Sequence, residues 1–160
     1  MTGKSMLRSA MKTLALTSAL AVATAASAAP APPPAPYGAV ITLDQAKRAA
    51  SAAEAEARRR GVAISIAIAG PTGEIVFFEH MDGAVYATDD LSKLKAKDSA
   101  RFRMPTSNFV TLQNAGQSFP GVFVGGGGMP LVVDGKTVGA IGISGAADDP
   151  IAQAGVDALK

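Results

Sequence analysis

Three isoleucines alternate with alanine and serine in the segment 62–69, and this period of two predicts a β-strand. Because the large and small side chains occupy opposite faces, we expect one layer to cover the isoleucines and a helix to lie close against the small residues. A second apolar run, 74–80, follows the turn residues 70–73, so the two segments predict an antiparallel pair. The pattern favours a sheet that is covered on both sides.

The glycine-rich stretch 121–145 predicts three further strands and the turns between them. These strands are expected at Val122–Val124, Met129–Val133 and Lys136–Ser144. Asp134–Gly135 is typical of a tight hairpin turn, since both residue types accept positive φ angles. Gly139 and Gly142 leave space against the last strand, which either admits a ligand or relieves crowding where a helix crosses the sheet.

Apolar periodicity and capping residues predict four helices around this sheet. They are expected at Leu43–Arg60, Leu91–Arg103, Thr106–Ala115 and Pro150–Leu159. Thr42 begins the first helix with a capping box and Gly61 ends it, whereas Asp89 or Asp90 is the expected cap of the second. Lys95 and the neighbouring lysines are placed on the solvated side of the second helix. Five strands and four helices with hairpin connections indicate an α/β (α+β) domain with a five-stranded antiparallel sheet.

The first 28 residues predict an export signal. A basic start at Lys4, Arg8 and Lys12 precedes an apolar run, and Ala26–Ala28 forms an A-x-A cleavage site. The run is short for a membrane span, so stable membrane insertion is not expected; a retained anchor is the alternative. The chain then divides into a signal peptide (1–28), a Pro/Ala-rich linker (29–40) and a domain (41–160). We therefore expect a periplasmic or secreted protein.

Charge and composition exclude several classes of function. The predicted signal carries three of the 15 basic residues, which leaves 12 basic against 13 acidic groups, a net charge of −1 for the mature chain. A nearly neutral domain does not favour nucleic-acid binding, and we interpret the basic run Arg58–Arg60 as a solvated helix end. The sequence has no cysteine and a single histidine, which excludes thiolate metal centres and sites built from several histidines.

Three motifs carry a resemblance to a known family. They are GGGGMPLVVDGKTVGAIGISGA at 125–146, VFFEHMDGA at 76–84 and KAKDSARFRMPTSNF at 95–109. Together they resemble the GlcG/HbpS family of small haem-binding proteins, which is also similar to the C-terminal domain of the PduO proteins, over roughly 42–159. The resemblance implies a profilin-like three-layer α/β/α domain, haem as the cofactor, a homo-oligomer and contact with a sensor-type protein partner.

His80 is the first residue to consider as a haem ligand. It ends an apolar strand beside the MDGA turn, where a neutral imidazole can bind haem iron axially. Members of the resembled family commonly have a different residue before this turn, often arginine. His80 is therefore either a ligand particular to this chain or a surface substitution without consequence.

Four other residues are candidates for contact with haem. Thr106 matches the threonine that the resemblance associates with the haem-contacting surface, although a threonine before an apolar helix is also an ordinary N-cap. Met81 and Met104 are softer ligands or residues of the core. Arg101, together with Arg103, can pair with haem propionates or simply decorate the end of a helix.

These residues predict an exported protein that holds haem rather than turning over a substrate. We expect the haem in an apolar cleft between the small-residue sheet and its flanking helices, or between subunits, with sensing, storage or transport as its role. Two alternatives stay open: an enzyme that degrades haem or acts on a small organic acid, and a protein-interaction module. Gly142–Ala146 is not a G-x-S-x-G elbow, and no phosphate-binding helix follows Gly125–Gly128, which argues against serine hydrolysis and nucleotide binding.

Overall fold

The computed structural model describes residues 33–160; the predicted signal peptide and residues 29–32 of the predicted linker lie outside the described part. The helices are α1 (Leu43–Arg60), α2 (Ala87–Phe102), α3 (Ser107–Asn114) and α4 (Asp148–Asp157). The strands are β1 (Ser65–Ala69), β2 (Ile75–His80), β3 (Gly128–Val133) and β4 (Lys136–Ser144). Within residues 33–160, no helix combines the length and the apolar character that a membrane crossing requires.

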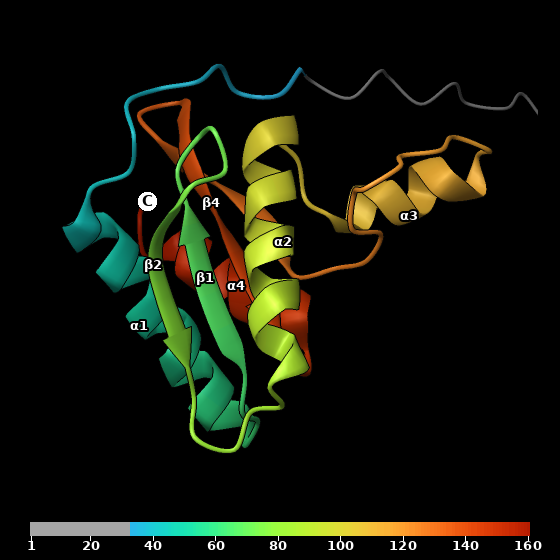
Figure 1. Cartoon of the computed structure of the whole chain (residues 1–160). Helices are drawn as coiled ribbons and strands as arrows, with labels where there is room; N and C mark the ends of the chain where they lie inside the picture. The colour runs from blue at the N-terminus through green and yellow to red at the C-terminus, as the bar shows by residue number, and fades with distance from the viewer. Residues whose placement is uncertain (1–32) are drawn as a thin grey trace, which may run out of the picture. The chain divides into compact units, whose positions relative to one another are not determined.

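The four strands form one antiparallel sheet in the order β2-β1-β4-β3. Helices α1 and α4 cover one face of this sheet and α2 covers the other, which agrees with the predicted mixed α/β class (Figure 1). The sheet differs from the predicted one in having four strands rather than five, because Val122–Val124 is not a strand. The backbone N–H of Phe123 donates to the Asp98 carboxylate at 2.8 Å instead of to a neighbouring strand.

Side-chain size separates the two faces of the sheet. The isoleucines at 64, 66 and 68, of which the last two belong to β1, are fully buried in the layer shared with α1 and α4, as their alternation predicted. Small residues face α2: Ala67 pairs with Gly142, and Gly142 pairs with Gly128, so a row of small residues crosses β1, β4 and β3. This row lets a helix approach the sheet closely.

Gly142 allows the backbone of α2 to lie directly on the sheet. A Cβ atom at this position would stand 2.0 Å from the carbonyl oxygen of Ser92 and 2.4 Å from the backbone nitrogen of Ala96. At Gly128, a Cβ atom would meet the carbonyl oxygen of Lys95 at 2.6 Å. The chain's own atoms therefore fill this space, and the expected apolar cleft between the sheet and α2 is absent from the described residues. Relief of crowding, the other interpretation of Gly142, is confirmed.

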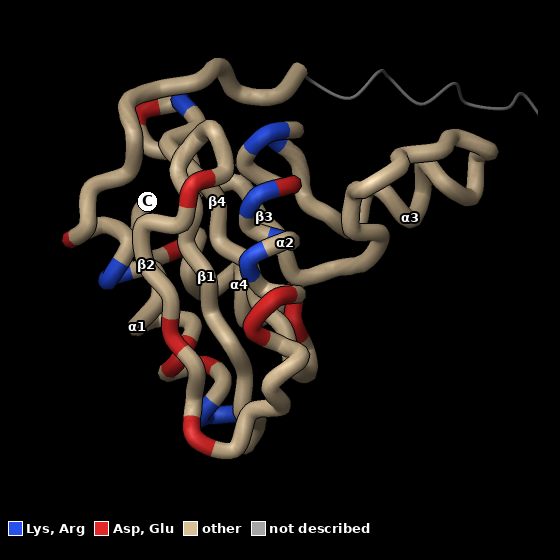
Figure 2. Tube along the Cα trace, viewed as in Figure 1, with Lys and Arg blue, Asp and Glu red and all other residues tan. Residues whose placement is uncertain are grey.

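Helix α1 begins and ends as predicted, whereas α2 begins earlier. Thr42 accepts a hydrogen bond from the Gln45 N–H at 3.2 Å, its own N–H donates to the Gln45 side chain at 2.9 Å, and Gly61 ends the helix with a φ of 68°. Helix α2 begins at Ala87, so Asp89 lies in its first turn rather than at its cap. Figure 2 shows acidic positions at this end of α2 and mostly basic positions beyond it, the order that complements the helix dipole.

Lys95 is buried, which differs from its predicted place on the solvated side of α2. Its side chain is 4% exposed, and its Nζ donates to the Asp148 carboxylate at 2.6 Å and to the carbonyl oxygen of Ile143 at 2.9 Å. The neighbouring Asp149 accepts a hydrogen bond from the Gly127 N–H at 2.5 Å. A buried ammonium group is tolerated only when it is paired, so this ion pair ties α2 to the start of α4.

Residues 103–127, here called the arm, leave the three layers after α2, carry α3 and return beside α2 to β3 (Figure 1). Phe109 of α3 is fully buried. Its ring meets those of Phe102 and Phe119 edge to face, with centroids 5.0 and 5.2 Å away. Phe109 and Phe119 of the arm therefore form an aromatic cluster with the last residue of α2, outside the main core.

Thr106 ties the arm to the sheet. Its N–H donates to the carbonyl oxygen of Gly128 and its Oγ1 accepts from the Gly128 N–H, both at 2.9 Å. The side chain is fully buried and makes no capping bond to α3. Thr106 therefore has the predicted N-cap position before α3 but not the capping hydrogen bond, because its hydroxyl accepts from the first residue of β3 instead.

The basic run at the end of α1 is paired with acidic residues one turn earlier. Arg58 contacts Glu54 at 2.5 Å, and Arg59 and Arg60 both contact Glu56 at 2.6 Å. These pairs use the guanidinium groups within the helix, which agrees with the interpretation of the run as a solvated helix end.

Glu56 is expected to titrate far below an ordinary glutamate. Hydrogen bonds from Arg59 and then from Arg60 lower its pKa from 4.5 to about 2. Because the folded-state pKa is the lower one, these contacts stabilise the fold above pH 4.5, and their contribution is lost as the pH falls toward 2. A carbon-13 carboxyl titration checks this, with Arg59→Gln expected to return the midpoint toward the ordinary value. A wild-type midpoint near about 4.3 would contradict the pairing.

Candidate functional site

The five residues predicted to contact haem lie in separate parts of the described structure. His80 ends β2, and Met81 follows it with its side chain in the core between the sheet and α1. Arg101 lies in the last turn of α2, while Met104 and Thr106 lie at the base of the arm. His80 is the strongest metal ligand among them.

A bulge in β2 aims His80 at α2. The pairing that begins with Ser65 opposite His80 keeps one register up to Ile68, after which β2 carries one unpaired residue, Val76. Without this bulge the register from the turn would place Glu79 opposite Ser65. Because successive residues of a strand point to opposite faces, the extra residue turns His80, and not Glu79, to the face that α2 covers.

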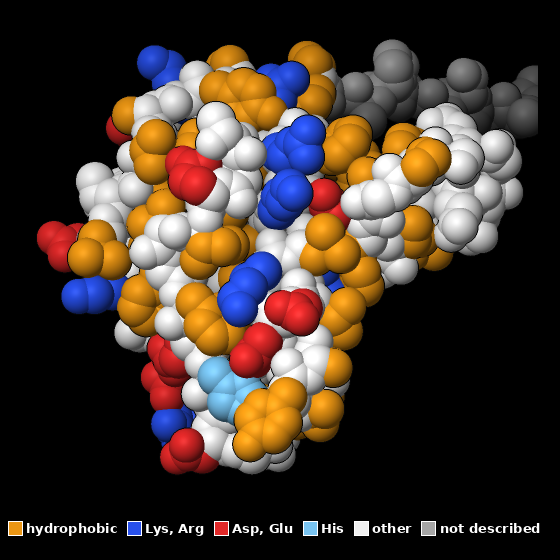
Figure 3. Space-filling model, viewed as in Figure 1, with side chains coloured by type: hydrophobic (Ala, Val, Ile, Leu, Met, Phe, Trp, Pro, Cys, Tyr) orange, Lys and Arg blue, Asp and Glu red, His pale blue; other side chains and the backbone are white. Residues whose placement is uncertain are grey.

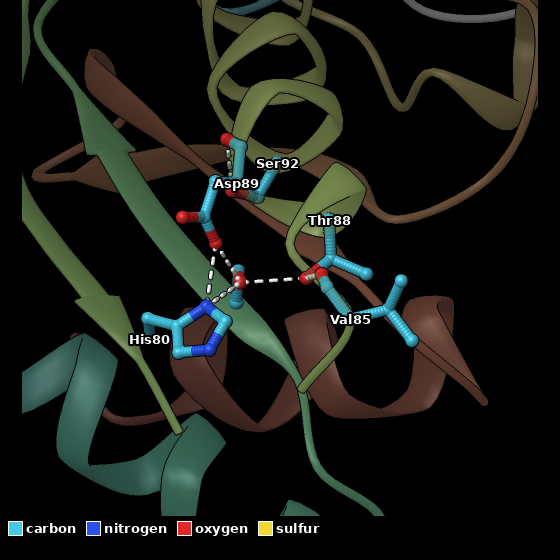
Figure 4. A network of polar contacts seen from close by, with 6 residues as sticks. His80, Val85, Thr88, Asp89 and Ser92 are labelled. Atoms are coloured by element: carbon cyan, nitrogen blue, oxygen red, sulfur yellow. Dashed lines mark hydrogen bonds and ion pairs between the residues drawn. The ribbon is translucent and has the colours of Figure 1, made fainter. Parts of the chain in front are cut away.

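His80 lies in a cluster of polar side chains from three elements (Figure 4). Its Nδ1 is 2.6 Å from Oδ1 of Asp89 in the first turn of α2 and 3.2 Å from Oγ of Ser65 on β1. Ser65 Oγ is also 2.6 Å from the same Asp89 oxygen and 2.7 Å from Oγ1 of Thr88. Ser65 is fully buried, whereas the imidazole is 27% exposed.

The available donors determine which nitrogen of His80 carries the proton. Hydrogen bonds from Ser65 and then from His80 lower the pKa of Asp89 below its ordinary value, so Asp89 is a carboxylate at neutral pH. A carboxylate cannot donate, and its contact with Nδ1 at 2.6 Å therefore requires a proton on Nδ1. In the neutral ring Nε2 is then a bare acceptor. Figure 4 shows Nε2 on the side of the ring away from Asp89.

The cluster contains a serine, a histidine and a carboxylate but lacks the geometry of a serine hydrolase. In a catalytic triad, the serine contacts Nε2 and the carboxylate contacts Nδ1. Here Ser65 and Asp89 both contact Nδ1 of His80, and Ser65 has no access to solvent. A histidine with one nitrogen held by a carboxylate and the other free is the arrangement of a metal ligand.

Exposed apolar side chains border the imidazole. Tyr86 stacks on the ring of His80 with centroids 5.8 Å apart and an interplanar angle of 13°. Tyr86 is 86% exposed and the preceding Val85 is 69% exposed. Figure 3 shows the imidazole at the surface with hydrophobic side chains beside it. These two side chains leave exposed apolar surface next to the imidazole.

Arg101 borders a depression at the other end of α2. The depression has a volume of about 450 Å³ and is also lined by Tyr37, Pro71 and Thr72. Tyr37 is held there because its hydroxyl donates to the carbonyl oxygen of Arg101 at 2.6 Å. Asp89 and Arg101 are 12 residues apart on α2, which corresponds to about 18 Å of helical rise. Arg101 is therefore not part of the His80 cluster.

Met104 lines a smaller depression on the arm, of about 260 Å³, together with Asn108, Thr111 and Leu112. Thr106 faces the interior beside it. The structure thus brings neither these residues nor Arg101 to His80. Their contact with haem, and that of Met81, stays a prediction from the sequence.

The partners of His80 are not evident from the sequence. Asp89 is identified there only as a helix cap, although the turn at 70–73 already places Ser65 within two residues of His80 across the hairpin. Val85 and Tyr86 offer a further signal. They are large apolar residues between a turn and a helix, and they belong neither to the apolar pattern of the preceding strand nor to that of the following helix.

Two comparisons of the sequence with known proteins give matches. The family model described as "Haem degrading protein HbpS-like" matches residues 41–157. Among curated proteins, the uncharacterized 15.0 kDa protein in the dhaT-dhaS intergenic region of Citrobacter freundii is 30% identical over 81 residues, or 46% of this chain. The chain covers 57% of the length of that protein.

Solved structures of similar proteins have the same fold. The Klebsiella pneumoniae protein ORFY is 26% identical with a TM-score of 0.71, over 76% of this chain and 92% of that one. A double mutant of HbpS from Streptomyces reticuli is 29% identical with a TM-score of 0.70, over 84% and 99%. The PduOC:heme complex is 23% identical with a TM-score of 0.70, over 76% and 96%, a likeness that shows the fold alone.

Proposed function

Because this chain belongs to the HbpS-like family, whose model is described as haem degrading, we propose that it binds haem with Nε2 of His80 as an axial ligand of the iron. The observation that carries the proposal is the contact of Asp89 with Nδ1 at 2.6 Å, which leaves Nε2 free. Neutral imidazole is a common axial ligand of haem iron. The structural neighbour PduOC, which shares this fold, was solved as a heme complex.

The side chains around His80 fit a metal that brings most of its own ligands. Among residues 33–160, no group of three or more histidine, aspartate or glutamate side chains is placed to hold a metal ion. A single imidazole is a poor site for a free ion, but haem supplies the equatorial ligands of its iron and requires from the protein an axial ligand and apolar contact. Val85 and Tyr86 offer such contact beside the ring.

A haem bound through His80 would lie at the surface rather than in the expected cleft, because α2 fills the space over the sheet. A bound small molecule usually has most of its surface buried. Val85 and Tyr86 alone offer too little apolar surface to enclose a macrocycle. The predicted homo-oligomer would supply the remaining cover from a second copy of the chain. Sedimentation with and without haem measures whether the chain self-associates.

A haem titration of the mature chain tests the proposal, with the chain made without a histidine tag because His80 is its single histidine. We expect a shifted Soret band that saturates at a single haem per chain. His80→Gly is expected to weaken binding by at least about tenfold, since it removes the axial nitrogen. Free imidazole added to this variant is expected to restore the wild-type spectrum by filling the space that the side chain leaves.

Met104→Leu is the matched control for this titration, because it removes a candidate sulfur ligand of the arm and leaves the His80 cluster unchanged. If His80 is the residue of this chain that holds the iron, Met104→Leu is expected to bind haem as the wild type does. Absence of any Soret shift at micromolar haem in the wild type would contradict haem binding. A His80→Gly spectrum identical to the wild type would contradict the ligand assignment alone.

The family description also names degradation, and the same titration separates holding from turnover. With ascorbate present, a protein that holds haem keeps its Soret band. Turnover would instead remove the band and release iron. Sensing, storage and transport of haem, and a sensor-type partner, stay predictions of the family resemblance.

We expect the chain to be exported and cleaved after Ala28, in the part of the sequence outside the described residues. The protein recovered from the periplasm or the medium is then expected to begin at Ala29, which an intact-mass measurement checks. A full-length mass in the membrane fraction would support the retained anchor instead.

A further inference from the structure

We infer that Asp89 makes this site selective for ferric haem, through its hydrogen bond to the imidazole that binds the iron. The inference rests on the proposed function and adds the oxidation state of the haem that the site prefers. Asp89 touches His80 and not the haem, so it is a positioning residue. Its effect on the iron passes through the imidazole ring.

The bond between Asp89 and His80 is short and well supported. At 2.6 Å it is shorter than the usual N–H···O hydrogen bond of about 2.9 Å, as expected when the acceptor is an anion. Ser65 donates to the same carboxylate oxygen at 2.6 Å, and Thr88 contacts Ser65 at 2.7 Å. Both hydroxyl residues are buried, so the carboxylate is anchored to the interior on the side away from the solvent.

A carboxylate that accepts the Nδ1 proton increases the electron density at Nε2. A more basic axial nitrogen stabilises the ferric iron more than the ferrous iron, because the ferric form carries the larger positive charge. The reduction potential of the bound haem then falls. By thermodynamic linkage, the preference for ferric over ferrous haem rises by the corresponding factor.

Asp89 also lies in the first turn of α2, where an acidic residue stabilises the helix whether or not it contacts a histidine. Asp90 provides the comparison, because it lies in the same turn, is exposed and has no hydrogen bond to His80 in the described structure. Asp90→Asn therefore changes the helix alone. Asp89→Asn changes the helix and the charge on the imidazole, while it keeps the size of the side chain and an acceptor oxygen.

The test is the midpoint potential of the haem-loaded chain, with the affinities for ferric and ferrous haem measured in parallel. Asp89→Asn is expected to bind ferric haem at least about tenfold more weakly, with a smaller change for ferrous haem. Each tenfold loss of ferric preference raises the potential of a one-electron couple by about 59 mV. We expect Asp90→Asn at the wild-type potential and Asp89→Glu, which keeps the charge, between the wild type and Asp89→Asn.

An unchanged potential in Asp89→Asn, with haem still lost in His80→Gly, would overturn this inference and leave haem binding through His80 intact. A wild-type chain that binds no haem would overturn both. Should Asp89→Asn load too little haem for the measurement, Asp89→Glu is measured in its place and is expected to raise the potential by a smaller amount, because it keeps the charge but displaces the carboxylate from Nδ1. No rise in Asp89→Glu would then count against the inference.

Discussion

Replacing Asp148 with alanine is expected to lower the free energy of unfolding by about 3–5 kcal/mol, because it leaves the buried charge of Lys95 without a partner. The Lys95 side chain is 4% exposed, and its Nζ is 2.6 Å from the Asp148 carboxylate. The carbonyl oxygen of Ile143, at 2.9 Å, remains as an acceptor but carries no full charge. Lys95→Met in the Asp148→Ala background is expected to recover much of the loss, since an apolar side chain needs no ion partner.

Urea unfolding measures these differences as a shift of the midpoint at constant slope. Asp157→Ala is the matched control, because it removes an aspartate from α4 that contacts Lys160 at 2.5 Å on the surface. Exposed pairs contribute little, so we expect the control to change stability by no more than about 1 kcal/mol. A loss in Asp148→Ala as small as that of the control would contradict the structural role of the buried pair.

The second large effect is expected at Gly142, where alanine should cost about 3 kcal/mol, the upper end of the range for overpacking. The added methyl group would stand 2.0 Å from the Ser92 carbonyl oxygen and 2.4 Å from the Ala96 nitrogen. Both are backbone atoms of α2, which cannot rotate away as a flexible side chain does. The helix must therefore move off the sheet, and calorimetric or urea unfolding records the loss.

Gly135→Asn is the control for this substitution. No atom lies within 4 Å of a Cβ at Gly135, and asparagine tolerates its φ of +71° better than most residues. We expect a change below about 1 kcal/mol. A Gly142→Ala chain as stable as the wild type would show that space exists beneath α2, and the apolar cleft predicted from the sequence would again be a candidate for haem.

The elements that the sequence predicts well are those determined by neighbouring residues. The ends of α1 follow from Thr42, Gln45 and Gly61, which lie within the helix or next to it. The alternation in β1 predicts its two-sided burial for the same reason, because the period of a strand is a local property.

The differences arise where a residue finds its partner far along the chain. The position of Lys95 along its helix predicts a solvated side chain. Its burial is possible only because it pairs with Asp148, 53 residues later in the chain. Val122–Val124 has the composition of a strand, but the N–H of Phe123 donates to Asp98 and not to a neighbouring strand. In the same way, the Thr106 hydroxyl accepts a hydrogen bond from the Gly128 N–H and does not cap α3.

The same distinction between local patterns and distant partners applies to the candidate site. His80 is recognisable because it is the single histidine and ends an apolar strand. Its orientation depends on one unpaired residue, Val76, and its protonation on Asp89, and neither follows from residue type or spacing. The sequence therefore indicates which residue can bind a metal but not which nitrogen is free to do so.

The nitrogen-15 spectrum of His80, with and without haem, tests most directly whether this residue holds the iron. Selective histidine labelling gives one pair of ring-nitrogen signals, because the chain has a single histidine. In the neutral ring of the haem-free chain we predict a proton on Nδ1 and none on Nε2. In the ferrous carbon monoxide complex, which is diamagnetic, we predict that the Nε2 signal shifts on binding iron while Nδ1 keeps its proton. Ring signals that stay at their haem-free positions when haem is bound would contradict the ligand role of His80.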